Sequence, residues 1–172
     1  AEQLYHELID DRSTTDEQKA VALRCLGTAM FFQERRDESQ KIMEELVEKY
    51  SKYPSSYKAL VFLAKLQEKN LEKSLALLKQ AEKIAVSNED AAAALDLTAA
   101  ILNYTHGKHE EARRVWLEVK QKYPETYWGE TAEDKIRASR LMEQFHQDMK
   151  AGRIDDLEEY FKQKGIHIDD GD

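Results

Sequence analysis

Proline and glycine are scarce in this chain of 172 residues, which contains only two prolines and six glycines. Sheet proteins depend on these residues for their frequent turns, so a fold dominated by short strands is not expected. Charged residues, in contrast, make up 35% of the chain, a composition typical of long helices with solvated faces. The length is sufficient for one domain with a substantial buried core.

The chain also lacks the features that mark contact with membranes or nucleic acids. No apolar run approaches the roughly 18 residues that a membrane-spanning helix requires, so we expect no membrane insertion. The formal net charge is −8, opposite to the basic excess of nucleic-acid binders, and we expect no nucleic-acid partner. The single cysteine, Cys25, cannot form a disulfide within the chain and is expected to be a small buried core residue.

Apolar residues recur at helical spacing along nearly the whole chain, which predicts helix after helix. The expected ranges are 1–10, 15–33, 37–50, 55–69, 71–85, 89–105, 109–122, 126–150 and 153–164. Thr14 precedes Glu17 by three residues, which predicts a capping box. Ser87 has the same spacing to Asp90 and predicts another helix start. Helix ends are expected at proline or glycine, namely at Pro54, Gly107, Pro124 and Gly165.

One phrase recurs in the sequence. GKHEEARRVWLEVKQKYP (107–124) matches RDESQKIMEELVEKYSKYP (36–54). In both, a small residue is followed three residues later by an apolar one and four residues later by a large apolar one. Related openings occur at 1–8, 39–46, 74–81, 112–119 and 157–164, the last with Leu157 in place of the small residue. The first four are spaced 38, 35 and 38 residues apart, and periods of this size indicate stacked helical hairpins.

The unit with Gly107, Ala112 and Pro124 resembles a tetratricopeptide repeat, in which a small residue and then a proline follow a glycine at this spacing. Leu26-Gly27 is similar to the Leu-Gly in the first helix of such repeats. The comparable small position in the next two first helices is taken by Ala64 and Ala100.

The resemblance covers nearly the whole chain and implies an all-α fold, a right-handed superhelical stack of antiparallel helix hairpins. A single domain is expected at 1–165. Within it we expect a lone helix at 1–10, then hairpins at about 15–50, 55–85, 89–122 and 126–164, with an acidic tail at 166–172. The Lys-Tyr-Pro endings are similar to bacterial cell-envelope members of the family, such as outer-membrane-assembly lipoproteins and Tol–Pal coordinators. For a bacterial protein, this favours the periplasm or cell envelope over the cytoplasm.

The function that the resemblance implies is a non-catalytic scaffold that binds a protein or peptide segment in a concave groove lined by the first helices. The side chains expected to face this groove are Arg24, Thr28, Phe31, Lys58, Val61, Lys65, Leu97, Ile101 and Tyr104. The family's clamp for acidic chaperone tails needs asparagines where this chain has Thr28 and Phe62, so that ligand is not expected.

A second interpretation is a structural assembly element of a larger complex, with self-association through the terminal helix at 1–10. An enzyme is not expected, because the chain has no P-loop, dinucleotide-binding glycines, HExxH motif or nucleophile elbow. No cofactor is expected. His106 and His109 lie close in sequence at a predicted turn. Zinc requires three or four converging ligands, so no metal site is expected there.

The aromatic residues divide into two groups. Trp116, Tyr5 and Phe161 occupy the repeated large apolar position and are expected in the core. Phe31 and Phe32 are consecutive, as are Tyr127 and Trp128. Because consecutive residues on a helix point in different directions, one member of each pair is expected outside the core.

Overall fold

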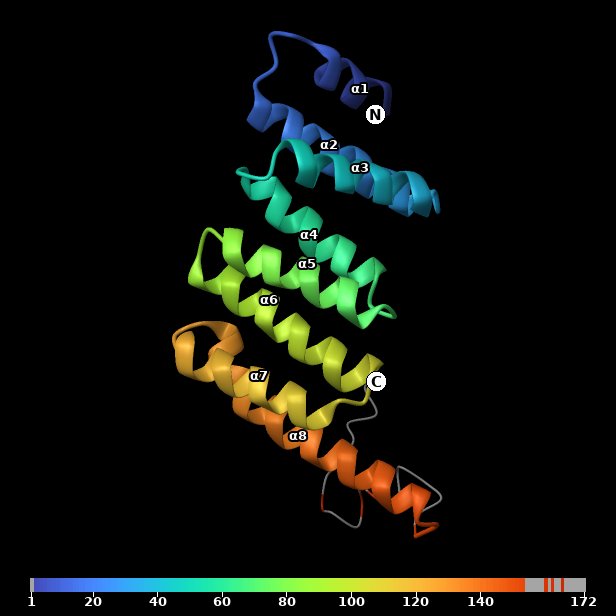
Figure 1. Ribbon diagram of the computed structural model, residues 1–172, viewed down its shortest axis with the longest axis vertical. Helices are drawn as coiled ribbons and strands as arrows, with labels where there is room; N and C mark the ends of the chain where they lie inside the picture. The colour runs from blue at the N-terminus through green and yellow to red at the C-terminus, as the bar shows by residue number, and fades with distance from the viewer. Residues whose placement is uncertain (1, 154–159, 161, 163–164, 166–172) are drawn as a thin grey trace.

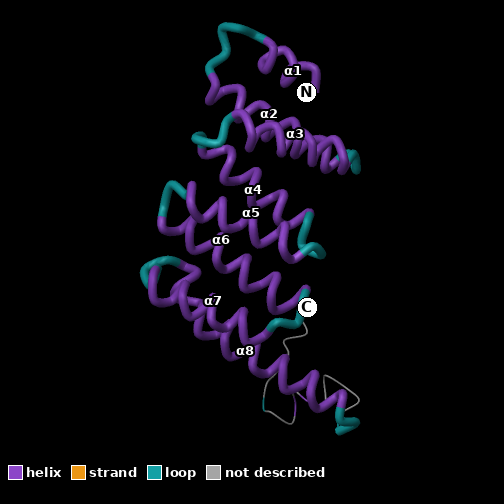
Figure 2. Tube along the Cα trace, viewed as in Figure 1, coloured by secondary structure: helices purple, strands orange, loops and turns teal. Residues whose placement is uncertain are grey.

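The computed structural model describes residues 2–153, 160, 162 and 165. This part of the chain is helical, and no strand occurs in it (Figure 2). Its elements in order are α1 (Glu2–Asp10), α2 (Asp16–Phe32), α3 (Arg36–Lys49), α4 (Pro54–Leu66), α5 (Leu71–Ile84), α6 (Asn88–Ala100), the π turn η1 (Ile101–Thr105), α7 (His109–Lys122) and α8 (Tyr127–Lys150). The all-α prediction is confirmed.

The helices follow one another in chain order along the longest axis of the molecule, and each runs antiparallel to the next (Figure 1). Each helix packs against its neighbours in sequence, and α2 also contacts α4, as α6 contacts α8. The core is therefore distributed between successive helices. The predicted helix at 153–164, including Phe161, lies largely outside the described residues, and the acidic tail lies wholly outside them. Tyr160 is described, and its buried ring lies 5.4 Å from that of Phe145.

Two expected helix boundaries need correction. The capping box of α2 is formed by Thr15 and Gln18, one residue later than predicted: Gln18 N donates to Thr15 Oγ1 (3.3 Å) and Thr15 N donates to Gln18 Oε1 (2.9 Å). Glutamine closes such a box as well as glutamate does, and this register places the acidic residues 16 and 17 in the first turn, where the helix dipole favours them. Pro54 does not end α3. It is the first residue of α4, where its missing N–H costs nothing.

The predicted cap at Ser87 is confirmed, because Ser87 Oγ accepts from Asp90 N at 3.1 Å. Gly107 lies in the turn before α7 with a φ of +63°, a conformation that glycine adopts without steric cost.

Small residues hold the paired helices close together. Ser39 Oγ donates to the carbonyl of Gly27 (2.7 Å), and Ser74 Oγ donates to that of Ala64 (2.9 Å). Both serines are completely buried, so each hydroxyl is satisfied by the backbone of the preceding helix. The small residues that recur in the sequence thus lie where α3 comes close to α2 and where α5 comes close to α4.

The large residues of the repeated phrase fill the space beside these contacts. Met43, Leu78 and Trp116 are each almost completely buried. In the third pair, Ala99 packs with Ala112 and Trp116, whereas Ala100 is only half-buried. The prediction of Ala100 was one residue off, and a one-residue step turns a helical side chain by about 100°.

The N-terminal end also differs from expectation. Tyr5 is half-buried, because α1 packs mainly on α2 and buries none of its residues fully. Cys25 is likewise half-buried, not a core residue, and lines a cavity of about 410 Å³ with Tyr5, Leu8 and Val21 between α1 and α2.

Candidate functional site

The nine side chains expected to bind a partner lie on α2, α4, α6 and η1. Arg24, Thr28 and Phe31 on α2 are half-buried, as are Val61 on α4 and Leu97 on α6. Lys58, Lys65 and Tyr104 are exposed, Tyr104 by 59%. Eight of the nine positions are therefore accessible to a ligand.

Ile101 is the exception and has to be withdrawn from the set. It is only 3% exposed and packs in a cluster with Ala64 and Leu78, residues of α4 and α5. Its backbone is still α-helical, and Leu97, one helical turn earlier, packs against the same cluster. Ile101 is therefore on the side of the helix that packs against α4 and α5.

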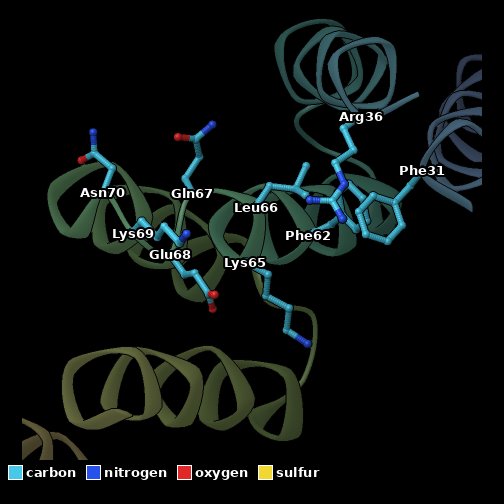
Figure 3. Close-up of a pocket in the computed structure, with 9 residues that line it drawn as sticks. All are labelled: Phe31, Arg36, Phe62, Lys65, Leu66, Gln67, Glu68, Lys69 and Asn70. Carbon is cyan, nitrogen blue, oxygen red and sulfur yellow. The ribbon is translucent and has the colours of Figure 1, made fainter. Parts of the chain in front are cut away.

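A cavity of about 680 Å³ opens where the end of α2, the start of α3 and the α4–α5 turn meet (Figure 3). We call it the Phe31–Phe62 cavity. Its lining residues are Phe31, Arg36, Phe62, Lys65, Leu66, Gln67, Glu68, Lys69 and Asn70. It brings together Phe31 and Lys65 from the predicted set, while the other predicted residues lie outside it.

The two phenylalanines form the apolar wall of this cavity. Their ring centroids lie 5.1 Å apart with the ring planes at 85°, an edge-to-face contact. The Arg36 guanidinium lies 5.7 Å from the Phe31 centroid, within range of a cation–π interaction. Phe32 is 80% exposed and does not line the cavity, although its ring contacts that of Phe31 edge to face at 6.0 Å. One member of this consecutive pair therefore lies outside the core, as expected.

Positive charge predominates around the aromatic pair. The lining includes Arg36, Lys65 and Lys69 but a single carboxylate, that of Glu68. None of the three cations forms an ion pair within the part of the chain that the structure describes. The cavity can therefore offer them to a ligand without breaking an existing ion pair.

The α4–α5 turn, which carries Lys69, is held from two sides. Gln67 Nε2 donates to Gln40 Oε1 of α3 (3.2 Å). The Glu68 carbonyl oxygen lies 2.7 Å from His106 Nε2, and since a carbonyl only accepts, the histidine ring donates this bond. The α4–α5 turn is thus connected to α3 and to the turn before α7.

Arg36, Leu66 and Lys69 line the cavity but were not predicted as site residues, and Phe62 was predicted only as a residue unsuited to chaperone tails. Arg36 lies on α3, a second helix of a pair, whereas the prediction considered only first helices. A signal was present for Lys69, which follows Lys65 by four residues at the end of a predicted helix.

The two histidines at the α7 turn are used in structural contacts. His106 bonds the Glu68 carbonyl, and His109 Nδ1 lies 2.8 Å from Asn103 Oδ1. Burial lowers the pKa of His109 below its ordinary value. The His109 ring also lies 5.7 Å from that of His146. Among residues 2–153 and the three later described positions, no group of three or more histidine, cysteine or acidic side chains could hold a metal ion.

In the described part of the chain, no helix combines the length and apolar character needed to cross a membrane. No model of a known protein family matches the chain, and no protein of curated function matches it at a significant level.

Proposed function

We propose that the protein is a non-catalytic interaction scaffold of tetratricopeptide-like repeats. In this proposal α2 to α8 form hairpins that stack into a right-handed superhelix, with α1 as an additional helix at one end. A segment of a partner protein lies across the face formed by α2, α4 and η1. Support comes from the recurrent close contact of Ser39 with Gly27 and Ser74 with Ala64, and from the chain-order packing of antiparallel helices.

The observation that carries the proposal is the Phe31–Phe62 cavity. Aromatic side chains in partly enclosed sites dominate the energetics of protein interfaces. Phe31 is half-buried, so its ring is already ordered by Phe62 and Arg36 before a ligand arrives. A ligand anchored there can extend over Val61 and Leu97 toward Tyr104, which is largely exposed.

The experiment is affinity capture from a native extract with immobilised wild type and two double variants. Phe31→Ser with Tyr104→Ser is expected to lose the captured partners, because both aromatic anchors of the proposed face are removed. The matched control, Phe32→Ser with Tyr127→Ser, removes the same two residue types from exposed positions outside the cavity. It is expected to capture like wild type. Equal recovery of the same partners by all three proteins would contradict the proposal.

The N-terminal end favours a second candidate, an assembly element in which α1 packs against another subunit. Leu4, Leu8 and Val21 are exposed apolar residues, and the last two line the cavity between α1 and α2. Under this candidate, the purified chain is expected to show a molar mass of a dimer or larger by light scattering, and Leu4→Glu with Leu8→Glu to restore the monomer. A monomeric wild type at all concentrations would exclude self-association through α1.

A further inference from the structure

The charge around the Phe31–Phe62 cavity is opposite to that of the whole chain. The chain carries a net charge of −8, whereas the cavity lining has three cations and one carboxylate. Some cations elsewhere in the chain pair with neighbouring acids, as Arg35 does with Glu2 and Lys120 with Glu133. A local basic site on an acidic protein attracts anionic ligands and orients them on approach.

The cations surround the aromatic wall and do not converge on one point. Arg36 reaches from α3 toward Phe31 and Phe62, whereas Lys65 extends away from Arg36 on the other side of α4 (Figure 3). Lys69 lies on the α4–α5 turn beyond Leu66 (Figure 3). Since the charges are distributed around an apolar centre, the complementary ligand has an apolar anchor with negative groups on more than one side of it.

This arrangement favours peptide carboxylates over a compact phosphate. A phosphate is bound best by converging cations or by free N–H groups at a helix N-terminus. The N-termini of α3 and α5 both border the cavity. At α5, Asn70 Oδ1 already accepts from Lys73 N at 3.2 Å. At α3, Asp37 and Glu38 in the first turn already place negative charge at the helix N-terminus and oppose a further anion there. Carboxylates of an extended peptide can lie on both sides of an apolar side chain, which suits cations that do not converge on one point (Figure 3).

We propose that the Phe31–Phe62 cavity binds a protein segment in which an aromatic or leucine side chain is flanked on both sides by aspartate or glutamate. The inference rests on the proposed scaffold function and names its partner class. The anchor packs on Phe31, Phe62 and Leu66. Arg36, held beside the Phe31 ring, presents its planar guanidinium to one carboxylate, and Lys65 or Lys69 meets another.

The test is selection of a phage-displayed library of random linear peptides on the immobilised full chain. Wild type is expected to enrich peptides with an aromatic residue or leucine between acidic residues. One enriched peptide, synthesised with a fluorescent label, then serves as the probe in polarisation measurements. Its affinity is expected to fall as the salt concentration rises, because exposed charges are screened.

Two charge-reversal variants locate the site. The double variant Arg36→Glu with Lys69→Glu is expected to bind the labelled peptide about tenfold more weakly or worse, because two attractive contacts with carboxylates become repulsive. Both positions are exposed, and glutamate in the first turn of α3 suits the helix dipole, so the fold is retained. The control is Lys79→Glu with Lys83→Glu, two exposed positions of α5 outside the cavity, which changes the net charge of the protein by the same amount. It is expected to bind the labelled peptide like wild type.

The outcomes separate the inference from the function on which it rests. Enriched peptides without acidic residues would overturn the inference and leave the scaffold function standing. Acidic peptides that bind the Arg36/Lys69 variant as tightly as wild type would also overturn it. Enrichment of no peptide above the blank support would count against the scaffold function itself.

Discussion

Trp116→Ala is expected to lower the free energy of unfolding by about 3–5 kcal/mol, the usual cost of truncating a large buried aromatic residue. Trp116 is only 1% exposed and packs with Ala99, Ala112 and Ile136 from three elements. Three alanines lie in the same cluster, at 99, 112 and 132, and they have few atoms with which to fill the space that the ring leaves. The measurement is urea denaturation of the variant and wild type, extrapolated to water.

A polar contact adds to this loss. Trp116 Nε1 donates to Asp96 Oδ1 (2.9 Å), and Lys135 Nζ donates to the same oxygen (2.6 Å). In Trp116→Ala, the largely buried Asp96 carboxylate still accepts a hydrogen bond from Lys135 but loses the one from the indole N–H. Trp116→Phe separates the two effects, since it retains much of the ring volume and removes the N–H, at an expected cost of about 1–2 kcal/mol.

Leu117→Ala is the matched control for this prediction. Leu117 is the next residue of α7 and is exposed, so truncation there is expected to cost less than about 1 kcal/mol. A Trp116→Ala variant that is destabilised no more than Leu117→Ala would show that the core between α6, α7 and α8 is not packed as described.

Gly129→Ala is expected to destabilise the protein by about 3 kcal/mol or more, at or above the upper end of the usual cost of inserting a methyl group into a packed site. A Cβ at Gly129 would lie 2.0 Å from the Tyr123 carbonyl oxygen and 3.0 Å from Pro124 Cα. Both are backbone atoms, so no side-chain rotation relieves the clash. Thr126 also holds the Tyr123 carbonyl in place, because its Oγ1 donates to that oxygen at 2.8 Å.

Gly27→Ala provides the comparison, since Gly27 also lies within a helix at a close contact. The nearest atom to its added Cβ is Met43 Cε at 2.9 Å, the flexible end of a long side chain. Alanine gains about 1 kcal/mol of helix propensity over glycine, which offsets part of the repacking. We therefore expect Gly27→Ala to change stability by less than about 1.5 kcal/mol. Thermal and urea denaturation of both variants would refute the prediction if Gly129→Ala proved the more stable of the two.

The local pattern of the sequence was sufficient for the helices and for much of the core. The spacing of apolar residues predicted the positions of α1 to α8 to within a few residues. The small and large residues of the repeated phrase identified Ser39, Ser74 and Trp116 as buried packing positions. Both results depend on periodicity within one or two turns of helix, which the sequence carries directly. Two predicted positions were wrong by one residue: the N-cap of α2 is Thr15 and not Thr14, and the buried small residue of α6 is Ala99 and not Ala100. In both cases two adjacent residues satisfied the pattern equally well.

The composition of the candidate site was decided by the tertiary structure. Arg36 and Phe62 come from different helices, and only the packing of α2, α3 and α4 brings them to Phe31. Ile101, expected on an accessible face, is buried because it packs against Ala64 of α4 and Leu78 of α5. Helical periodicity tells which residues share one side of a single helix. The sides on which separate helices meet depend on interactions between residues far apart in the chain. Local spacing does not predict these interactions.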